Sequence, residues 1–109
     1  MEQQVDVLPD EDGVRVIACT GEFDQDILGP LKAACTAATD DPGVRRIVLD
    51  VTQVAFADSS MLNLMLRLRA TDRLVLAGPL PAQLARLLDV TSARTLFLTA
   101  EGIEAARVL

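Results

Sequence analysis

The chain contains no histidine at all, and this absence excludes several kinds of catalytic site. A Ser-His-Asp or Cys-His nucleophile arrangement needs an imidazole base, which the sequence cannot supply. The two cysteines, Cys19 and Cys35, stand on separate predicted elements without metal-ligand spacing. The six glycines are scattered and form no phosphate-binding loop. We therefore predict a protein that is not an enzyme, with no catalytic residue, no metal site and no cofactor.

Positive charge is also scarce, with ten Lys and Arg residues against sixteen Asp and Glu and a net charge of −6. Without a basic stripe to neutralise phosphates, neither nucleic acid nor an anionic lipid surface is an expected partner. The sequence lacks an apolar run long enough to span a bilayer and a start typical of a signal peptide. Both cysteines are expected to be free packing thiols. We expect a cytoplasmic domain without membrane insertion.

Aromatic residues are few, since the chain has three Phe and neither Trp nor Tyr. Half of the residues are nevertheless apolar, so Leu, Val, Ile and Ala must fill the core. A chain of 109 residues has room for one core, and we predict a single domain over residues 1–109. The sequence does not predict an oligomeric state.

Hydrophobic periodicity predicts alternating strands and helices after an initial antiparallel hairpin. Gly21 is expected to end the second strand, and Thr99 is expected to cap the last helix. The predicted order is β-β-α-β-α-β-α-β-α, an α/β fold with a mixed, mostly parallel sheet covered by helices. The predicted strands are 5–7, 14–20, 46–51, 73–77 and 96–98, and the predicted helices begin near residues 28, 59, 82 and 100.

A short polar stretch, Asp58-Ser59-Ser60, separates the central strand from the next helix. The helical crossover between strands 14–20 and 46–51 makes them parallel, so the segments that follow them, 21–26 and 54–60, should be neighbours. Asp24 and Ser59 are therefore expected to share one surface at the carboxyl edge of the sheet. By itself, Asp-Ser-Ser at this place is most often a helix N-cap and nothing more.

The helix predicted to begin at Ser59 has an apolar arc of roughly 200°, wider than the ~100° stripe of an ordinary surface helix. Two interpretations of Met61 and Leu64 are equally supported by the pattern. Both residues could pack against neighbouring helices, or both could project toward a partner protein.

Four segments together resemble the STAS domain, and more closely the bacterial anti-sigma-factor antagonists. The resemblance extends over nearly the full length in the right order, which implies a STAS-like fold. The first segment, Cys19-Thr20-Gly21-Glu22-Phe23-Asp24, is similar to the family's Gly-Glu-Leu-Asp strand end, and the second, Arg46-Ile47-Val48-Leu49-Asp50-Val51, is similar to its central strand. The third, Val54-Ala55-Phe56-Ala57-Asp58-Ser59-Ser60, is similar to its phosphorylation motif. The fourth, Leu87-Leu88-Asp89-Val90-Thr91, is similar to its late helix and the turn after it.

The resemblance implies that the protein binds an anti-sigma factor, itself a serine kinase, and so releases a sigma factor. The kinase would inactivate it by phosphorylating Ser59, and a serine phosphatase would restore it. Where the family has Gly-Leu-Gly, this chain has Met61-Leu62-Asn63, so a Met side chain would fill space that the glycine leaves to the partner. The implied partner-binding residues, together with the two from the helix pattern, are Asp24, Asp58, Ser59, Ser60, Met61 and Leu64.

Two other functions are weighed against this one. The first is a scaffold STAS domain that is not phosphorylated, such as the small subunit of a bacterial lipid-transport ABC complex. There Ser59 would be a cap or a constant contact. The second is an enzyme using Asp24 and Asp58 as acid and base. A solvated acidic rim is the better interpretation of these carboxylates.

Overall fold

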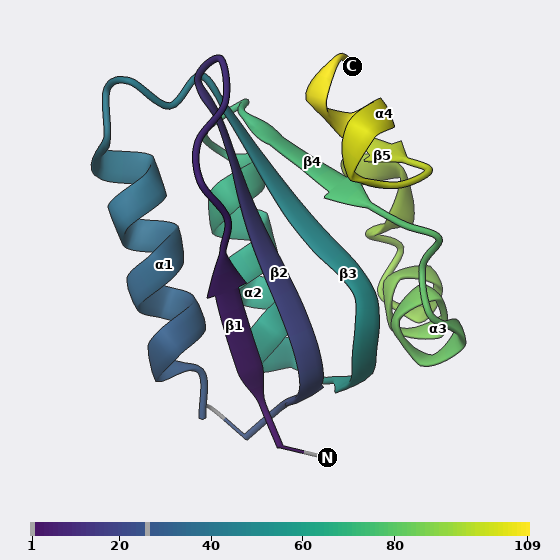
Figure 1. Cartoon of the computed structure of the whole chain (residues 1–109). Coiled ribbons are helices and arrows are strands. Elements are labelled where there is room, and N and C mark those ends of the chain that lie inside the picture. Colours follow the sequence, from purple (N-terminus) through teal and green to yellow (C-terminus); the bar gives the residue numbers. More distant parts are fainter. Residues whose placement is uncertain (1, 26) are drawn as a thin grey trace.

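The computed structural model describes residues 2–25 and 27–109, which form a five-stranded sheet with helices on both faces (Figure 1). The strands lie in chain order, β1-β2-β3-β4-β5; β1 is antiparallel to β2, and the other neighbours are parallel. The predicted mixed, mostly parallel fold with an N-terminal hairpin is confirmed. The elements are β1 Gln4–Val7, β2 Val14–Phe23, α1 Gly29–Asp40, β3 Arg46–Ala57, α2 Ser59–Arg69, β4 Leu74–Ala77, α3 Ala82–Val90, the 3₁₀ turn η1 Arg94–Leu96, β5 Thr99–Ala100 and α4 Ile103–Arg107.

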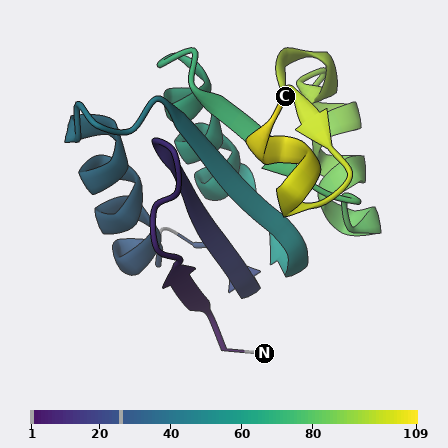
Figure 2. The same cartoon turned by 45° about the horizontal axis from the view of Figure 1, so that its top comes forward.

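The core is divided by the sheet into a large and a small cluster. The large cluster joins β2, β3 and β4 to α1, α2 and α3, through residues such as Ile17, Leu49 and Met65. The small cluster lies on the opposite face, where Ala106 of α4 packs with Val48 and neighbouring valines. Figure 2 shows α4 on the face of the sheet opposite α1 and α2. This two-sided cover explains why Ile47, Val48 and Leu49 are all buried, as expected for a central parallel strand.

Two strands are longer than the sequence pattern predicts. Gly21 does not end β2, which continues to Phe23, and β3 continues to Ala57 instead of stopping at Val51. The added residues pair Gly21 with Val54 and Phe23 with Ala57, across register irregularities. Gly21 has φ +102°, and a Cβ there would overlap the carbonyl oxygen of Glu2. The glycine thus bends β2 and admits the N-terminal segment without terminating the strand.

The predictions for the C-terminal segment are wrong in detail. The predicted strand at 96–98 is replaced by η1 and by β5, which begins at Thr99. Leu98 is 62% exposed and shares one hydrogen bond with the sheet, from Leu76 N to Leu98 O. Thr99 therefore belongs to a strand and does not cap a helix; α4 begins at Ile103 after Gly102. None of the helices in the described ranges is long and apolar enough to cross a membrane.

Candidate functional site

The polar stretch at 58–60 lies where β3 ends and α2 begins, beside the end of β2. The Asp58 amide donates to the carbonyl oxygen of Phe23 over 3.3 Å, and the Gln25 amide donates to Asp58 Oδ2 over 2.8 Å. Asp24 is half-buried in the turn between these two contacts. The structure therefore brings together the two segments that the topology placed side by side. We call the surface formed by Asp24, Gln25, Asp58, Ser59 and Ser60 the Ser59 corner.

Asp58 is a clamp between the two segments of the Ser59 corner. Its Oδ1 accepts the amide of Ser60 at 2.8 Å, which makes Asp58 the N-cap of α2. Its Oδ2 accepts the amide of Gln25, a residue with φ +54°. These donated hydrogen bonds, with that of Gln25 foremost, lower the pKa of the Asp58 carboxyl below its usual value, because they favour the charged form. Asp58 is thus an ionised carboxylate with both oxygens engaged.

The two serines differ in access. Ser59 is exposed as the first residue of α2, and within the part of the chain that the structure describes its hydroxyl has no hydrogen-bond partner. Ser60 is half-buried, and both its amide and its side chain bond to Asp58. Of the two hydroxyls, the one at Ser59 is therefore open to a reacting partner.

Met61 and Leu64, the two residues of α2 expected to meet a partner, are both turned inward. Met61 is 0% exposed and belongs to the large core cluster. Of the two interpretations of Met61, its burial favours packing in the core over contact with a partner protein. Leu64 is 7% exposed and lines a surface hollow between α1 and α2. Its side chain is therefore largely buried and contributes to the lining of that hollow.

Two glutamines that the sequence analysis did not single out hold the backbone of the site. Gln83 of α3 accepts the amide of Ala57 and donates to the carbonyl of Ala57, both at 2.8 Å. Gln3 donates to the carbonyls of Glu22 (3.1 Å) and Ile27 (2.7 Å), across the turn that carries Asp24. In the sequence, the only signal for such a role is that the polar residue Gln83 directly precedes Leu84, which is buried.

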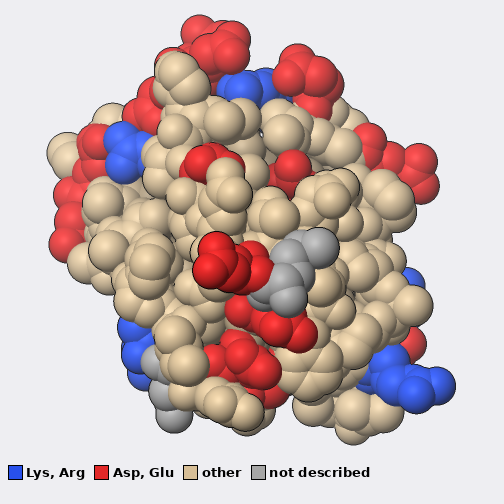
Figure 3. All heavy atoms as spheres, turned by 60° about the horizontal axis from the view of Figure 1, so that its bottom comes forward, with Lys and Arg blue, Asp and Glu red and all other residues tan. Residues whose placement is uncertain are grey.

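Several acidic side chains lie at this end of the molecule. Glu22 is exposed, and Asp24 and Asp58 are partly exposed. Figure 3 shows acidic side chains gathered near the middle of the face at this end, with basic ones toward its margins. Among the described residues no three His, Cys, Asp or Glu side chains lie close enough together to hold a metal ion. The site can therefore present a hydroxyl on an acidic surface to another protein.

A family model described as "Mlab, STAS domain" matches residues 8–99. Among solved structures, an anti-sigma factor antagonist from Mycobacterium paratuberculosis is similar at 23% identity and a TM-score of 0.79, covering 98% of this chain and 92% of that one. The anti-sigma factor antagonist SpoIIAA in its unphosphorylated form is similar at 20% identity and a TM-score of 0.70. The match covers 96% of this chain and 94% of that one. The Bacillus cell fate determinant SpoIIAA in its phosphorylated form is similar at 18% identity and a TM-score of 0.67. The match covers 97% of this chain and 100% of that one. No curated protein matches the sequence.

Proposed function

The chain belongs to the STAS domain family, and we propose that it acts as an anti-sigma-factor antagonist that phosphorylation of Ser59 switches off. The observation that carries the proposal is the exposed Ser59 hydroxyl at the first residue of α2, held in place by the Asp58 clamp. The similarity in fold to antagonists in unphosphorylated and phosphorylated forms supports it. The proposed role is regulatory binding without turnover.

The proposed partner is an anti-sigma factor that is also a serine kinase, with a serine phosphatase reversing the reaction. The surface proposed to meet it consists of Asp24, Asp58, Ser59 and Ser60, with Leu64 at the edge of the adjoining hollow. Met61 contributes only by filling the core beneath this surface. The binding surface is therefore the Ser59 corner and the first turns of α2, and we place it in the cytoplasm.

Phosphorylation at Ser59 would change the surface more than the fold. A phosphate adds about −1.5 to −2 charges, which the positive end of the α2 dipole tolerates. Asp58 already occupies the amide of Ser60, so the phosphate gains little new hydrogen bonding there. The carboxylates of Asp24 and Asp58 would oppose the added charge. The expected result is a folded protein whose contact surface repels a partner that fitted the unmodified form.

The direct test is phosphorylation with the anti-sigma serine kinase of the same organism and Mg-ATP, followed by phosphosite mapping. We expect label in the wild type and in Ser60→Ala, and none in Ser59→Ala. The paired serine variants are matched, because they lie side by side and differ in exposure. Absence of label at Ser59 under conditions where the kinase binds the protein would reject the switch.

The binding test compares wild type with Ser59→Asp and Ser59→Ala by isothermal titration against the same partner. We expect Ser59→Asp to weaken binding roughly tenfold or more, because like charges across an interface cost several kcal/mol. Ser59→Ala should bind about as well as wild type. If Ser59→Asp binds unchanged, or if an ATPase subunit of a transporter binds in place of the kinase, the scaffold function replaces the proposed one.

A further inference from the structure

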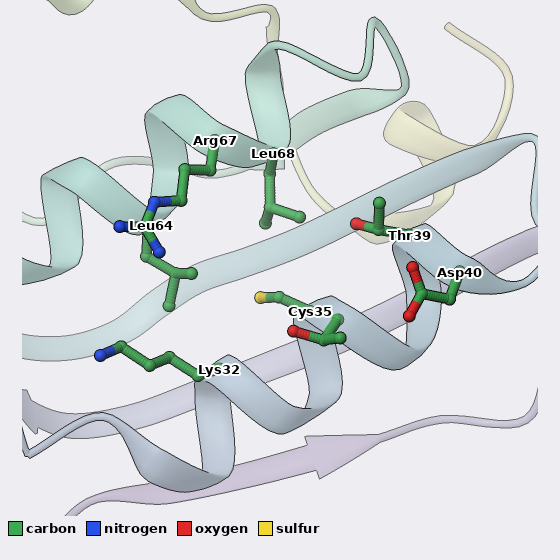
Figure 4. Close-up of a pocket in the computed structure, with 8 residues that line it drawn as sticks. Lys32, Cys35, Thr39, Asp40, Leu64, Arg67 and Leu68 are labelled. Atoms are coloured by element: carbon green, nitrogen blue, oxygen red, sulfur yellow. The ribbon is translucent and has the colours of Figure 1, made fainter.

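A hollow of about 250 Å³ lies between α1 and α2 (Figure 4). The floor is apolar, formed by Cys35 of α1 and by Leu64 and Leu68 of α2, each at least 93% buried. A smaller hollow of about 70 Å³, which shares Leu64, continues past Asn63 to Ser60. The two hollows form a groove along the helix pair, which we call the α1–α2 groove.

The groove carries two cations without partners. Lys32, the only lysine of the chain, and Arg67 line both hollows and are exposed. Within residues 2–25 and 27–109 neither side chain makes an ion pair or a hydrogen bond. By contrast, Arg15, Arg94 and Arg107 are bound to carboxylates. On a protein of net charge −6, these two cations beside an apolar floor make one end of the groove locally positive.

The charges along the groove have a direction. Asp40 lines the larger hollow but not the smaller one, whereas Lys32 and Arg67 line both. In Figure 4, Lys32 and Arg67 extend toward the same end of the groove, on either side of Leu64, and Asp40 lies at the opposite end. An occupant would therefore place negative charge beside the N-terminal turns of the two helices and avoid it beside Asp40.

We propose that the α1–α2 groove docks an acidic amphipathic helical segment of a partner protein. One apolar side chain of that segment enters the hollow over Leu64 and Leu68, and its carboxylates meet Lys32 and Arg67 through charge-assisted hydrogen bonds. A protein segment fits better than a small ligand, because a hollow of about 250 Å³ is smaller than ordinary ligand sites of roughly 300–1,000 Å³ and suits one anchoring side chain. The two cations that carry this proposal, Lys32 and Arg67, lie outside the Ser59 corner, so the docking is proposed separately from phosphorylation at Ser59.

The test uses the full chain labelled with ¹⁵N and two synthetic helical peptides that differ only in charge. Each peptide carries one Leu anchor; one flanks it with Glu, and the other flanks it with Lys. We expect the Glu peptide to shift the amide resonances of α1 and α2, to bind roughly tenfold or more tightly than the Lys peptide, and to weaken as salt is added. Charge reversal in Lys32→Glu/Arg67→Glu should invert the preference. Arg86→Glu, an exposed reversal on α3, is the matched control and should leave it unchanged.

Several outcomes would overturn the proposal. Equal binding of the two peptides, no binding of either, or resonance shifts confined to other surfaces would each reject the groove as an acid-binding site. A preference that survives the double charge reversal would do the same. If sedimentation shows a dimer that dissociates in Lys32→Glu/Arg67→Glu, the occupant is a second copy of this chain and not a partner segment.

Discussion

Single side chains hold the Ser59 corner in shape by binding main-chain groups of the residues around it. Asp58 joins the amides of Gln25 and Ser60, which belong to segments more than thirty positions apart. Gln3 spans the turn between them from outside. Ser59 gains its exposed position from these neighbours, since its own hydroxyl takes no part. The residue that would react and the residues that position it are therefore separate.

The charge state of Asp58 predicts how the stability of the fold depends on pH. The pKa of this carboxyl is lowered below 3.8 in the folded protein, because the amides of Gln25, Ser60 and Met61 and the Ser60 side chain donate to the charged form. Stability from this clamp is present above pH 3.8 and is lost as the pH falls through the lowered pKa. Asp58→Ala should cost about 1 kcal/mol of unfolding free energy at pH 7, as loss of an N-cap does, and less at about pH 2. Urea unfolding measures both.

A carboxyl-carbon NMR titration of Asp58 tests the cause directly. A midpoint at or above 3.8 would contradict the clamp. Ser59→Ala is the control for the unfolding series, because its hydroxyl holds no group in the described structure, and its unfolding free energy should match that of the wild type at both pH values.

Met61 gives a second prediction at this scale. Its side chain is fully buried, so Met61→Gly would leave a cavity and add a glycine to a helix. Together these two effects should lower the unfolding free energy by about 3–6 kcal/mol. Met61→Leu should cost less than about 1.5 kcal/mol, because it nearly conserves volume. Denaturant unfolding distinguishes the two. A well-tolerated Met61→Gly would mean that the side chain lies outside the core.

At the scale of whole elements, the sequence pattern predicted the order of the strands and helices better than the residues at which they begin and end. Strand and helix alternation predicted the parallel neighbours, and this was enough to place Asp24 beside Ser59. The pattern missed the extensions of β2 and β3, because Gly21 with positive φ suits a bend within a strand as well as a stop. The Leu96–Leu98 triplet was misassigned because three apolar residues fit a short strand or a turn equally well.

The extension of β3 depends on α3, and this gives a prediction about Gln83. β4 pairs with β3 only as far as Asp50, so Gln83 supplies the hydrogen bonds of Ala57 that a neighbouring strand would otherwise supply. Gln83→Ala leaves a buried amide and carbonyl without their partner and should cost about 1–3 kcal/mol in urea unfolding. Hydrogen exchange at the Ala57 amide should become faster.

The matched control is Arg86→Ala, on the same helix but exposed, which should stay within about 0.5 kcal/mol of the wild type. Gln83→Glu should keep the bond from the Ala57 amide and lose the one to its carbonyl, so an intermediate loss is expected. Unchanged exchange at Ala57 in Gln83→Ala would show that α3 does not hold the end of β3.

In the molecule as a whole, charged side chains lie at the two ends, and two neutral thiols are buried in the core between them. At the end opposite the Ser59 corner, Arg15 binds Asp10 and Asp41, which joins the β1–β2 turn to the end of α1. Between the ends, Cys19 on β2 and Cys35 on α1 belong to one core cluster. Both thiols are free and buried, as expected from their places on separate predicted elements.

The buried thiols predict how the whole fold responds to alkali. Burial raises the pKa of Cys35 to about 12 and that of Cys19 further, because a thiolate in the core would lose its hydration. The unfolded chain ionises near 9, so unfolding free energy should fall as the pH rises above 9, by about 1.4 kcal/mol per pH unit for each thiol. Urea unfolding under reducing conditions measures this slope. Cys19→Ala/Cys35→Ala is less stable at neutral pH but should show a flatter slope, and equal slopes in the two proteins would mean that the thiols already ionise in the native state.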